Sequence, residues 1–152
     1  MTFLPSHIQI ALAELGYRET APNVTKYTAA YDAHGTYSYQ GQAWCAIFAW
    51  WCLQEAGVTL PVMQYGAYPG AASVRYLLAG CEAQGWPVTV PEPGDLFFLD
   101  HHVGFVVRVI GELIVTVEGN TSGPTPASEW VYVHTRKIVD CLGFARVPRY
   151  LK

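Results

Sequence analysis

Apolar residues in the first half of the chain recur at the three-and-four spacing of helix faces. The first such stretch, residues 8–15, ends at Gly16, which is well placed as a helix stop. Two further stretches, residues 44–56 and 71–82, have the same period. Residues 17–42 are rich in Tyr, Thr, Ala and Gly without a steady period. The pattern predicts three helices, with a long irregular loop between the first two.

The second half of the chain has a β pattern. After PEPGD come short runs rich in Val, Ile, Phe and Tyr, namely LFFLD, HVGFVVRV, LIVTVEG, WVYVHTR and GFARV. Turn residues separate these runs, as is typical of strands in an antiparallel sheet. The order predicts an α+β fold, with N-terminal helices packed on a C-terminal antiparallel sheet.

Size and composition predict one domain. The 152 residues are 51% hydrophobic and 14% charged, and the 14 glycines and 10 prolines are spread along the whole length. A chain of this size can bury one sizeable core. No internal repeat or low-complexity tract divides it, so we expect a single domain over residues 1–152, present as a monomer.

The charge pattern excludes two classes of partner. The net charge is −3, and the sequence has no cluster of Lys and Arg. Nucleic acids and anionic membrane surfaces bind largely through clustered basic groups, so neither is expected. No apolar run approaches the roughly 20 residues of a membrane span. The opening MTFLPSHIQIALAELG lacks the basic start of a signal peptide. We therefore expect a soluble protein made in the cytoplasm, without membrane insertion.

The four cysteines, at positions 45, 52, 81 and 141, form no CxxC pair. A chain of this length needs no disulfide, so we expect reduced thiols. Cys45 and Cys52 are roughly 10 Å apart along the predicted helix, beyond disulfide reach. Cys45 falls in the first helical turn, where the helix dipole and unpaired N–H groups favour a thiolate. The alternative is a small buried core residue.

A histidine partner for Cys45 is predicted from the hairpin in DHHVGFVVRVIGELIVTVEGN. With Gly111 in the turn, His102 lies opposite the end of the next strand. Glu118 and Asn120 share one face of that strand by alternation, so both can hold the imidazole. A cysteine at a helix start, a histidine opening one strand and a polar residue ending the next are the parts of a cysteine nucleophile system.

His101 is the competing histidine. By alternation it shares a face with Phe105, whereas His102 shares one with Gly104, whose missing side chain would let a helix approach. This difference favours His102. Asp100 could orient either imidazole, and the alternative for Asp100 is a solvated loop carboxylate.

Three separated blocks resemble one family. WCAIFAWWCLQEAGV, PGDLFFLDHHVGFVV and VEGNTS are similar to the signature blocks of CHAP domains, the cysteine, histidine-dependent amidohydrolases/peptidases related to papain and to the NlpC/P60 enzymes. The segment LGYRETAPNVTKY also resembles the start of CHAP domains in phage endolysins and related wall hydrolases. The resemblance covers nearly the whole chain and implies a papain-like α+β fold.

The resemblance also implies an activity, hydrolysis of an amide bond in bacterial peptidoglycan. The bond is either the N-acetylmuramoyl-L-alanine linkage or a peptide bond. The resemblance implies Cys45 as nucleophile, His102 as general base and then acid, and Glu118 with Asn120 as orienting groups. We expect a phage endolysin that acts on the cell wall after holin-dependent release. The alternatives are an interbacterial amidase toxin and an inactive wall-binding module.

Residues just before Cys45 are candidates for contact with the oxyanion or the substrate. Gln42 could donate to the oxyanion, as a glutamine does in papain-like relatives, or bond the local backbone. Tyr37 and Tyr39 could line a groove, and Trp44 is either groove wall or core.

Some CHAP domains bind calcium in a loop ahead of the cysteine. The segment YDAHGTYSYQGQAWC keeps Asp32 and Gly35 but has His34 where a second acid would be expected. Calcium requires several oxygen ligands, so we expect neither a metal nor a cofactor.

Overall fold

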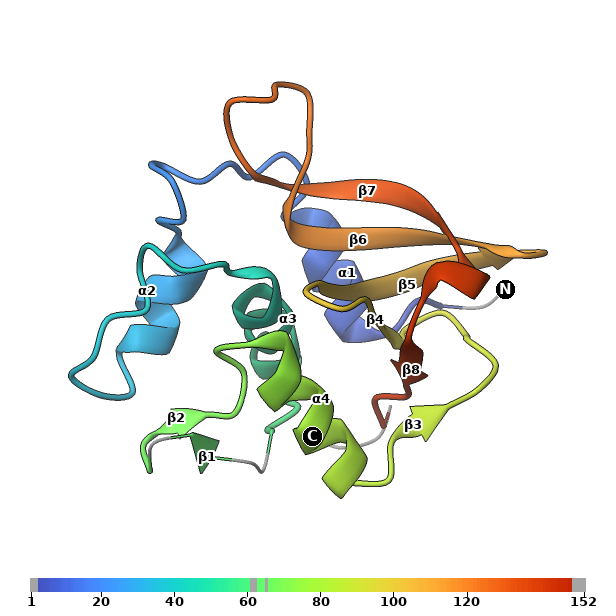
Figure 1. Cartoon of the computed structure of the whole chain (residues 1–152), viewed down its shortest axis with the longest axis horizontal. Helices are drawn as coiled ribbons and strands as arrows, with labels where there is room; N and C mark the ends of the chain where they lie inside the picture. Colours follow the sequence, from blue (N-terminus) through green and yellow to red (C-terminus); the bar gives the residue numbers. More distant parts are fainter. Residues whose placement is uncertain (1–2, 61–62, 65, 149–152) are drawn as a thin grey trace.

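A computed structural model shows, over the residues that it describes, four α-helices beside a six-stranded antiparallel sheet (Figure 1). The α+β class and its order, helices first and most of the sheet afterwards, are therefore confirmed. The structure describes residues 3–60, 63–64 and 66–148. The predicted single domain also includes positions outside the described residues, namely 1–2, 61–62, 65 and 149–152.

Three of the helices lie where the sequence predicts them. They are α1 (Ser6–Ala13), α3 (Cys45–Glu55) and α4 (Val74–Ala83). Beyond α1, Gly16 has a φ of 89°, which glycine adopts readily after a helix end. Within the described part of the chain, no helix is long and apolar enough to cross a membrane.

Helix α2 (Lys26–Asp32) lies inside the segment 17–42, so the prediction of an irregular loop is wrong over these residues. Thr25 caps the helix, because its side chain accepts a backbone N–H of the first turn at 3.1 Å. Tyr27 and Tyr31 are both buried. Their four-residue spacing is one helical repeat, which is too short to stand out in a segment of mixed composition.

The sheet has the strand order β3-β8-β4-β5-β6-β7. Its strands are β3 (Pro87–Val88), β4 (Leu96–Phe98), β5 (Val103–Ile110), β6 (Leu113–Thr121), β7 (Trp130–Lys137) and β8 (Gly143–Ala145). A short 3-10 helix, η1 (Ile138–Asp140), follows β7. Each of the five predicted runs overlaps with one of the strands β4 to β8. Strand β3 and the separate pair β1 (Met63–Gln64) and β2 (Tyr68–Pro69) were not predicted, because two residues show no alternation.

The β5–β6 hairpin has the register that the sequence predicts. Gly111 lies in the turn with a φ of 58°, and Phe105 pairs with Val117. His102 directly precedes β5. It therefore lies beside the end of β6, where the polar residues are.

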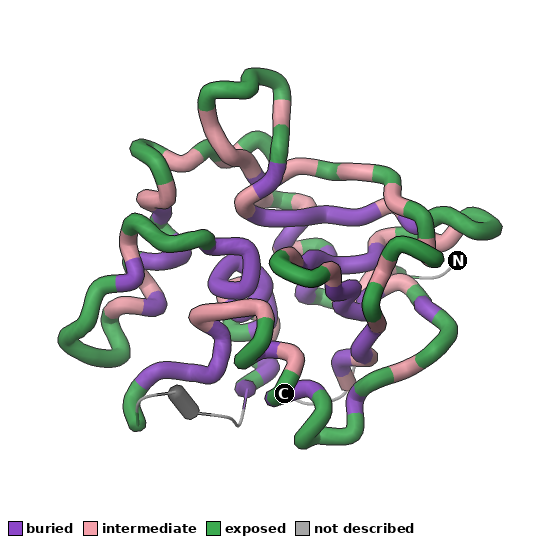
Figure 2. Tube along the Cα trace, in the orientation of Figure 1, coloured by how far each residue is buried: buried purple, intermediate pink, exposed green. Residues whose placement is uncertain are grey.

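Helix α3 lies at the centre of the core and, like most of β6, is buried (Figure 2). Helices α1 and α2 pack against it, and its other side contacts β5 and β6. The helix comes very close to β6 at Gly119, where an added Cβ would lie 2.6 Å from the Cβ of Phe48. The absence of a side chain at Gly119 therefore lets α3 rest on the sheet.

Gly104 has a different role from the predicted one. A Cβ at Gly104 would lie 2.7 Å from the ring of Phe97 and 2.8 Å from Cγ of Glu118. Phe97 belongs to a smaller apolar cluster with Val106 and Ile114, separate from the main core around α3. The space at Gly104 is thus filled by side chains of the sheet itself, and the prediction that a helix approaches there is wrong.

Candidate active site

Cys45 is the first residue of α3 and is almost fully buried, with 3% of its surface exposed. No acidic residue occupies the first turn of this helix. The positive end of the helix dipole therefore acts on the thiol without a competing carboxylate in that turn.

Trp44 fixes the start of α3 from inside the core. Its side chain is completely buried, and its Nε1 donates a hydrogen bond to Glu19 Oε2 at 3.2 Å. The same carboxylate accepts the backbone N–H groups of Asn23 and Glu129. Trp44 is therefore a core residue, and the predicted contact of its side chain with a substrate does not fit this position.

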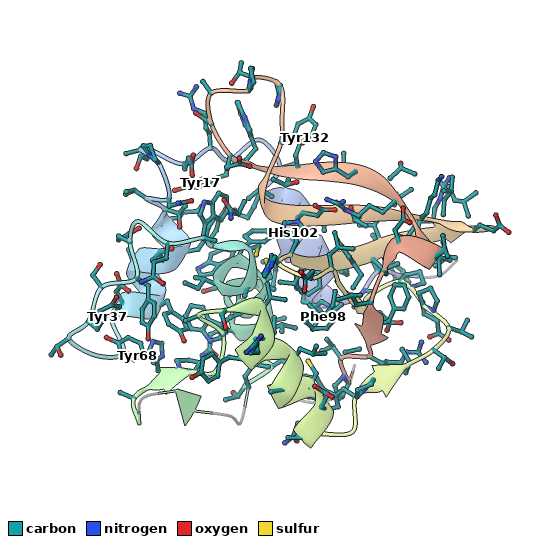
Figure 3. The ribbon with its side chains drawn as sticks, in the orientation of Figure 1. Tyr17, Tyr37, Tyr68, Phe98, His102 and Tyr132 are labelled. Atoms are coloured by element: carbon teal, nitrogen blue, oxygen red, sulfur yellow. The ribbon has the colours of Figure 1, made fainter. Side chains whose placement is uncertain are left out.

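His102 lies between Cys45 and Glu118. Its Nε2 is 2.7 Å from Glu118 Oε1, and its side chain is 17% exposed. Burial lowers the pKa of His102, but hydrogen bonds with the Cys45 thiol and the Glu118 carboxylate outweigh burial and raise the pKa to about 9. Because Glu118 engages Nε2, Nδ1 is the ring nitrogen left for the thiol. Figure 3 shows His102 near the middle of the molecule, between the helices and the strands.

Glu118 is fully buried and accepts hydrogen bonds on both carboxylate oxygens. Oε1 accepts from Thr121 Oγ1 at 3.1 Å and Arg136 Nη2 at 2.6 Å, in addition to His102. Oε2 accepts from Thr116 Oγ1 at 2.5 Å and Arg136 Nε at 2.6 Å. Burial raises the pKa of Glu118, but these bonds, above all those from Arg136, hold the pKa well below its usual range. The carboxylate beside His102 is therefore ionised.

Asn120 takes a different position from the one that strand alternation predicts. A bulge interrupts β6 between Glu118 and Thr121, and Asn120 has a left-handed φ of 54° within it. Thr121, not Asn120, donates to Glu118. The prediction that Glu118 and Asn120 share one face is therefore wrong. Among the hydrogen bonds of the described residues, only Glu118 of this pair reaches His102.

His101 is turned toward solvent. Its Nε2 is 3.2 Å from Asp100 Oδ2, and the two side chains are 93% and 83% exposed. Asp100 therefore accompanies His101, and the structure brings His102 to Cys45 and Glu118.

All four cysteines are free thiols, as predicted. Burial raises the pKa of Cys52, and it raises the pKa of Cys81 to about 12, so both remain protonated thiols. Burial also raises the pKa of Cys141. Cys45 is the cysteine that combines a helix start with a histidine partner.

A groove of about 560 Å³ opens beside Cys45. Its lining includes Gln42 before α3, Arg75 in the first turn of α4, and Asp100 in the β4–β5 connection. Cys45 is also part of this lining, so a ligand bound in the groove lies beside the candidate nucleophile.

The two tyrosines that were candidates for the groove differ in position. Tyr37 is 56% exposed, and its hydroxyl accepts a hydrogen bond from Gln42 Nε2 at 3.0 Å. Tyr39 is buried and packs edge-on against Tyr31 and Tyr68. Tyr37 therefore lies next to the groove, whereas the buried position of Tyr39 does not fit the predicted substrate contact.

The carboxylate of Asp32 closes the loop that follows α2. Its oxygens accept the backbone N–H of Tyr39 at 2.7 Å and the hydroxyl of Ser38 at 2.9 Å. Within the described ranges, no group of three or more His, Cys, Asp or Glu side chains is placed to hold a metal ion.

A thiol, an imidazole and an ionised carboxylate in this order can carry out nucleophilic attack with proton transfer. The imidazolium form of His102 is stabilised by Glu118, and the helix start offers unpaired N–H groups beside Cys45. This chemistry suits the cleavage of a carbonyl compound with a basic leaving group, such as an amide.

The comparison with protein families agrees with this chemistry. The model of the CHAP domain matches residues 36–120, more than half of the chain. The chain therefore belongs to the CHAP domain family, which consists in general of cysteine amidases and peptidases that act on peptidoglycan. The matched segment includes Cys45, His102 and Glu118. Comparisons with curated proteins and with solved structures gave no match.

Sequence reasoning missed the residues that hold Glu118, namely Thr116, Thr121 and Arg136. Thr116 has the same parity as Glu118 in β6, so alternation could have indicated it. Thr121 lies beyond the bulge, and Arg136 lies on a strand whose register the sequence does not reveal.

Proposed function

We propose that this domain hydrolyses an amide bond of bacterial peptidoglycan, with Cys45 as nucleophile, His102 as general base and then acid, and Glu118 as the group that orients His102. The observation that carries this proposal is the contact of His102 with both the Cys45 thiol and a buried, ionised carboxylate. Membership of the CHAP family supports the substrate class.

The proposed reaction begins with transfer of the thiol proton to Nδ1 of His102. The Cys45 sulfur then attacks the carbonyl carbon of the amide, and N–H groups at the start of α3 stabilise the oxyanion. His102 returns the proton to the leaving amine, which breaks the C–N bond and leaves a thioester on Cys45. Water attacks the thioester with His102 as base, which releases the carboxylic acid and restores the thiol.

Substrate contacts in this proposal come from the groove beside Cys45. Gln42 lines it and is the proposed side-chain donor to the oxyanion, although its Nε2 donates to Tyr37 in the free protein. Tyr37 is exposed next to Gln42 and is a proposed contact for the glycan or peptide part of the substrate.

Digestion of purified peptidoglycan sacculi tests the proposal. The wild-type protein is expected to release fragments, and their masses distinguish a cut at the N-acetylmuramoyl-L-alanine linkage from a cut within the peptide. Cys45→Ala is expected to lower the rate by roughly 10³-fold or more, because the nucleophile is removed. Cys81→Ala is the control, since Cys81 lies in α4 and its pKa is affected only by burial and Glu82; it is expected to keep the rate. Hydrolysis at the wild-type rate by a folded Cys45→Ala variant would contradict the proposal.

We further propose that the protein acts as a phage endolysin, made in the cytoplasm and released to the wall through a holin. The similarity of LGYRETAPNVTKY to the start of endolysin CHAP domains supports this setting. Expression in a bacterium with sensitive peptidoglycan is expected to cause lysis only when a holin is co-expressed. Rapid lysis without a holin would contradict this setting.

A further inference from the structure

Arg136 joins the site from the strand next to Glu118. Its Nε and Nη2 each lie 2.6 Å from a different oxygen of Glu118, so the guanidinium binds the carboxylate at two points. Strand β7 pairs with β6 so that Arg136 is opposite Ile114 and Tyr132 is opposite Glu118. Arg136 therefore reaches along the face of the sheet to a carboxylate four residues further along the neighbouring strand.

The position of Arg136 is itself fixed. Its guanidinium carbon lies 5.6 Å from the centre of the Phe97 ring, and the Phe97 ring occupies the space left by Gly104. A guanidinium held by a ring and by two hydrogen bonds has little freedom to rotate. Its side chain is 28% exposed, so its charge lies mostly out of water beside a fully buried carboxylate.

We propose that Arg136 is a positioning residue of the active site, because its two-point contact fixes the Glu118 carboxylate toward His102 and keeps the carboxylate charged. This inference rests on the proposed function of Cys45 and His102. A purely structural role for Arg136, as a link between β6 and β7, is the competing explanation. The two explanations differ in what they predict for the reactivity of Cys45 at different pH values.

The groups that face Glu118 decide the direction of the pH effect. His102 contacts it from the segment before β5, Arg136 from β7, and Cys141 interacts with it from the segment after η1. Tyr132 is its register partner on β7. Burial raises the pKa of Glu118, and among the interactions that lower this pKa the hydrogen bonding with Arg136 contributes most. Without it, burial raises the pKa of Glu118, and the carboxylate takes up a proton as the pH falls.

The test measures alkylation of Cys45 by iodoacetamide between pH 4 and 8, with mass spectrometry to separate Cys45 from the other cysteines. The rate of Cys45 alkylation decreases as the pH falls. In Arg136→Gln, this decrease (the acid limb of the pH profile) is expected to occur at a pH higher by about 1–3 units. Lys137→Gln removes the same charge from the next position of β7 and is expected to leave the limb unchanged. Circular dichroism confirms that each variant is folded. An unshifted limb in folded Arg136→Gln would overturn the proposal.

Arg136→Lys provides a second measurement that does not depend on the stability of the glutamine variant. Lysine keeps the charge but cannot bind both carboxylate oxygens in one plane. The pH at which Cys45 alkylation slows is therefore expected to stay near its wild-type value, while the maximal rate of alkylation falls by roughly threefold or more. If Cys45 of Arg136→Lys were alkylated at the wild-type maximal rate, the positioning role would be overturned. Wild-type Cys45 that reacts no faster than Cys141 would instead contradict the proposed function itself.

Discussion

Glu118→Gln removes one charge from the buried end of the site and keeps the shape of the side chain. Both carboxylate oxygens accept an N–H of Arg136, Oε1 from Nη2 and Oε2 from Nε. In either orientation of the new amide, its NH₂ group therefore faces an N–H of Arg136. The substitution replaces a hydrogen bond with a contact between two donors, and it leaves a partly buried cation without its counter-ion.

The expected loss of stability follows from this geometry. Removal of one partner from a buried ion pair costs about 3–5 kcal/mol, and the partial exposure of Arg136 favours the lower end, about 3 kcal/mol. For a chain of this size, that loss corresponds to a decrease in Tm of about 6–12 °C.

The same substitution changes the titration of His102. The raised pKa of about 9 means that interactions of the imidazolium stabilise the fold fully below pH 6.5, and that this contribution is lost as the pH rises through 9. Cys45 supplies the largest favourable contribution and Glu118 the next. Without the Glu118 charge, the pKa of His102 is expected to fall toward its ordinary value of 6.5.

Thermal unfolding followed by circular dichroism measures the first effect, and a pH titration of the histidine ring signals by NMR measures the second. Asn120→Gly is the matched control, since glycine accepts the left-handed φ of 54° at this position. It is expected to leave the pKa of His102 unchanged. A Glu118→Gln variant with wild-type Tm and a wild-type His102 titration would refute the reasoning.

Two further predictions concern the histidine pair and the glycine below Glu118. His102→Ala is expected to abolish hydrolysis of sacculi, whereas His101→Ala keeps it, because His101 is paired with an exposed carboxylate at the surface; the reverse result would assign the base to His101. Gly104→Ala is expected to lower stability by about 1–3 kcal/mol in denaturant unfolding, because the new Cβ overlaps with Phe97 and Glu118. Gly143→Ala is the control, since no atom lies within 4 Å of a Cβ there, and equal stability of both variants would contradict the packing argument.

The sequence was most informative where local rules determine the structure. The apolar, helix-spaced run around Cys45 predicts α3, and Gly111 in the turn sets the register of the β5–β6 hairpin to within the one-residue shift between Val106 and Arg108. The hairpin register places His102 beside Glu118, but the contact of His102 with Cys45 also requires α3 to pack on β5 and β6. The identity of the reactive groups was therefore predictable from the sequence and its resemblance to CHAP domains, whereas the packing that joins them was not.

The sequence was least informative where the position of a residue depends on distant parts of the chain. Trp44 is adjacent to Cys45 in sequence, yet its indole turns inward to a carboxylate, Glu19, from another segment. Arg136 lies on β7, which residues 122–129 separate from β6, and this connection is too long for a turn type to fix the register. Neither contact could be derived from spacing, because both depend on how separate segments pack.

The bulge in β6 explains why Glu118, and not Asn120, contacts His102. In a regular strand, Asn120 would share the face of Glu118, and Thr121 would point to the opposite face. Glu118 pairs with Tyr132 and Thr121 pairs with Trp130, so β6 has one residue more than β7 between these pairs. Because of the extra residue, Thr121 lies on the same face as Glu118, and its hydroxyl donates a hydrogen bond to Glu118. Asn120, within the bulge, has a left-handed φ of 54°. The same bulge that displaces the amide therefore adds a donor to the carboxylate.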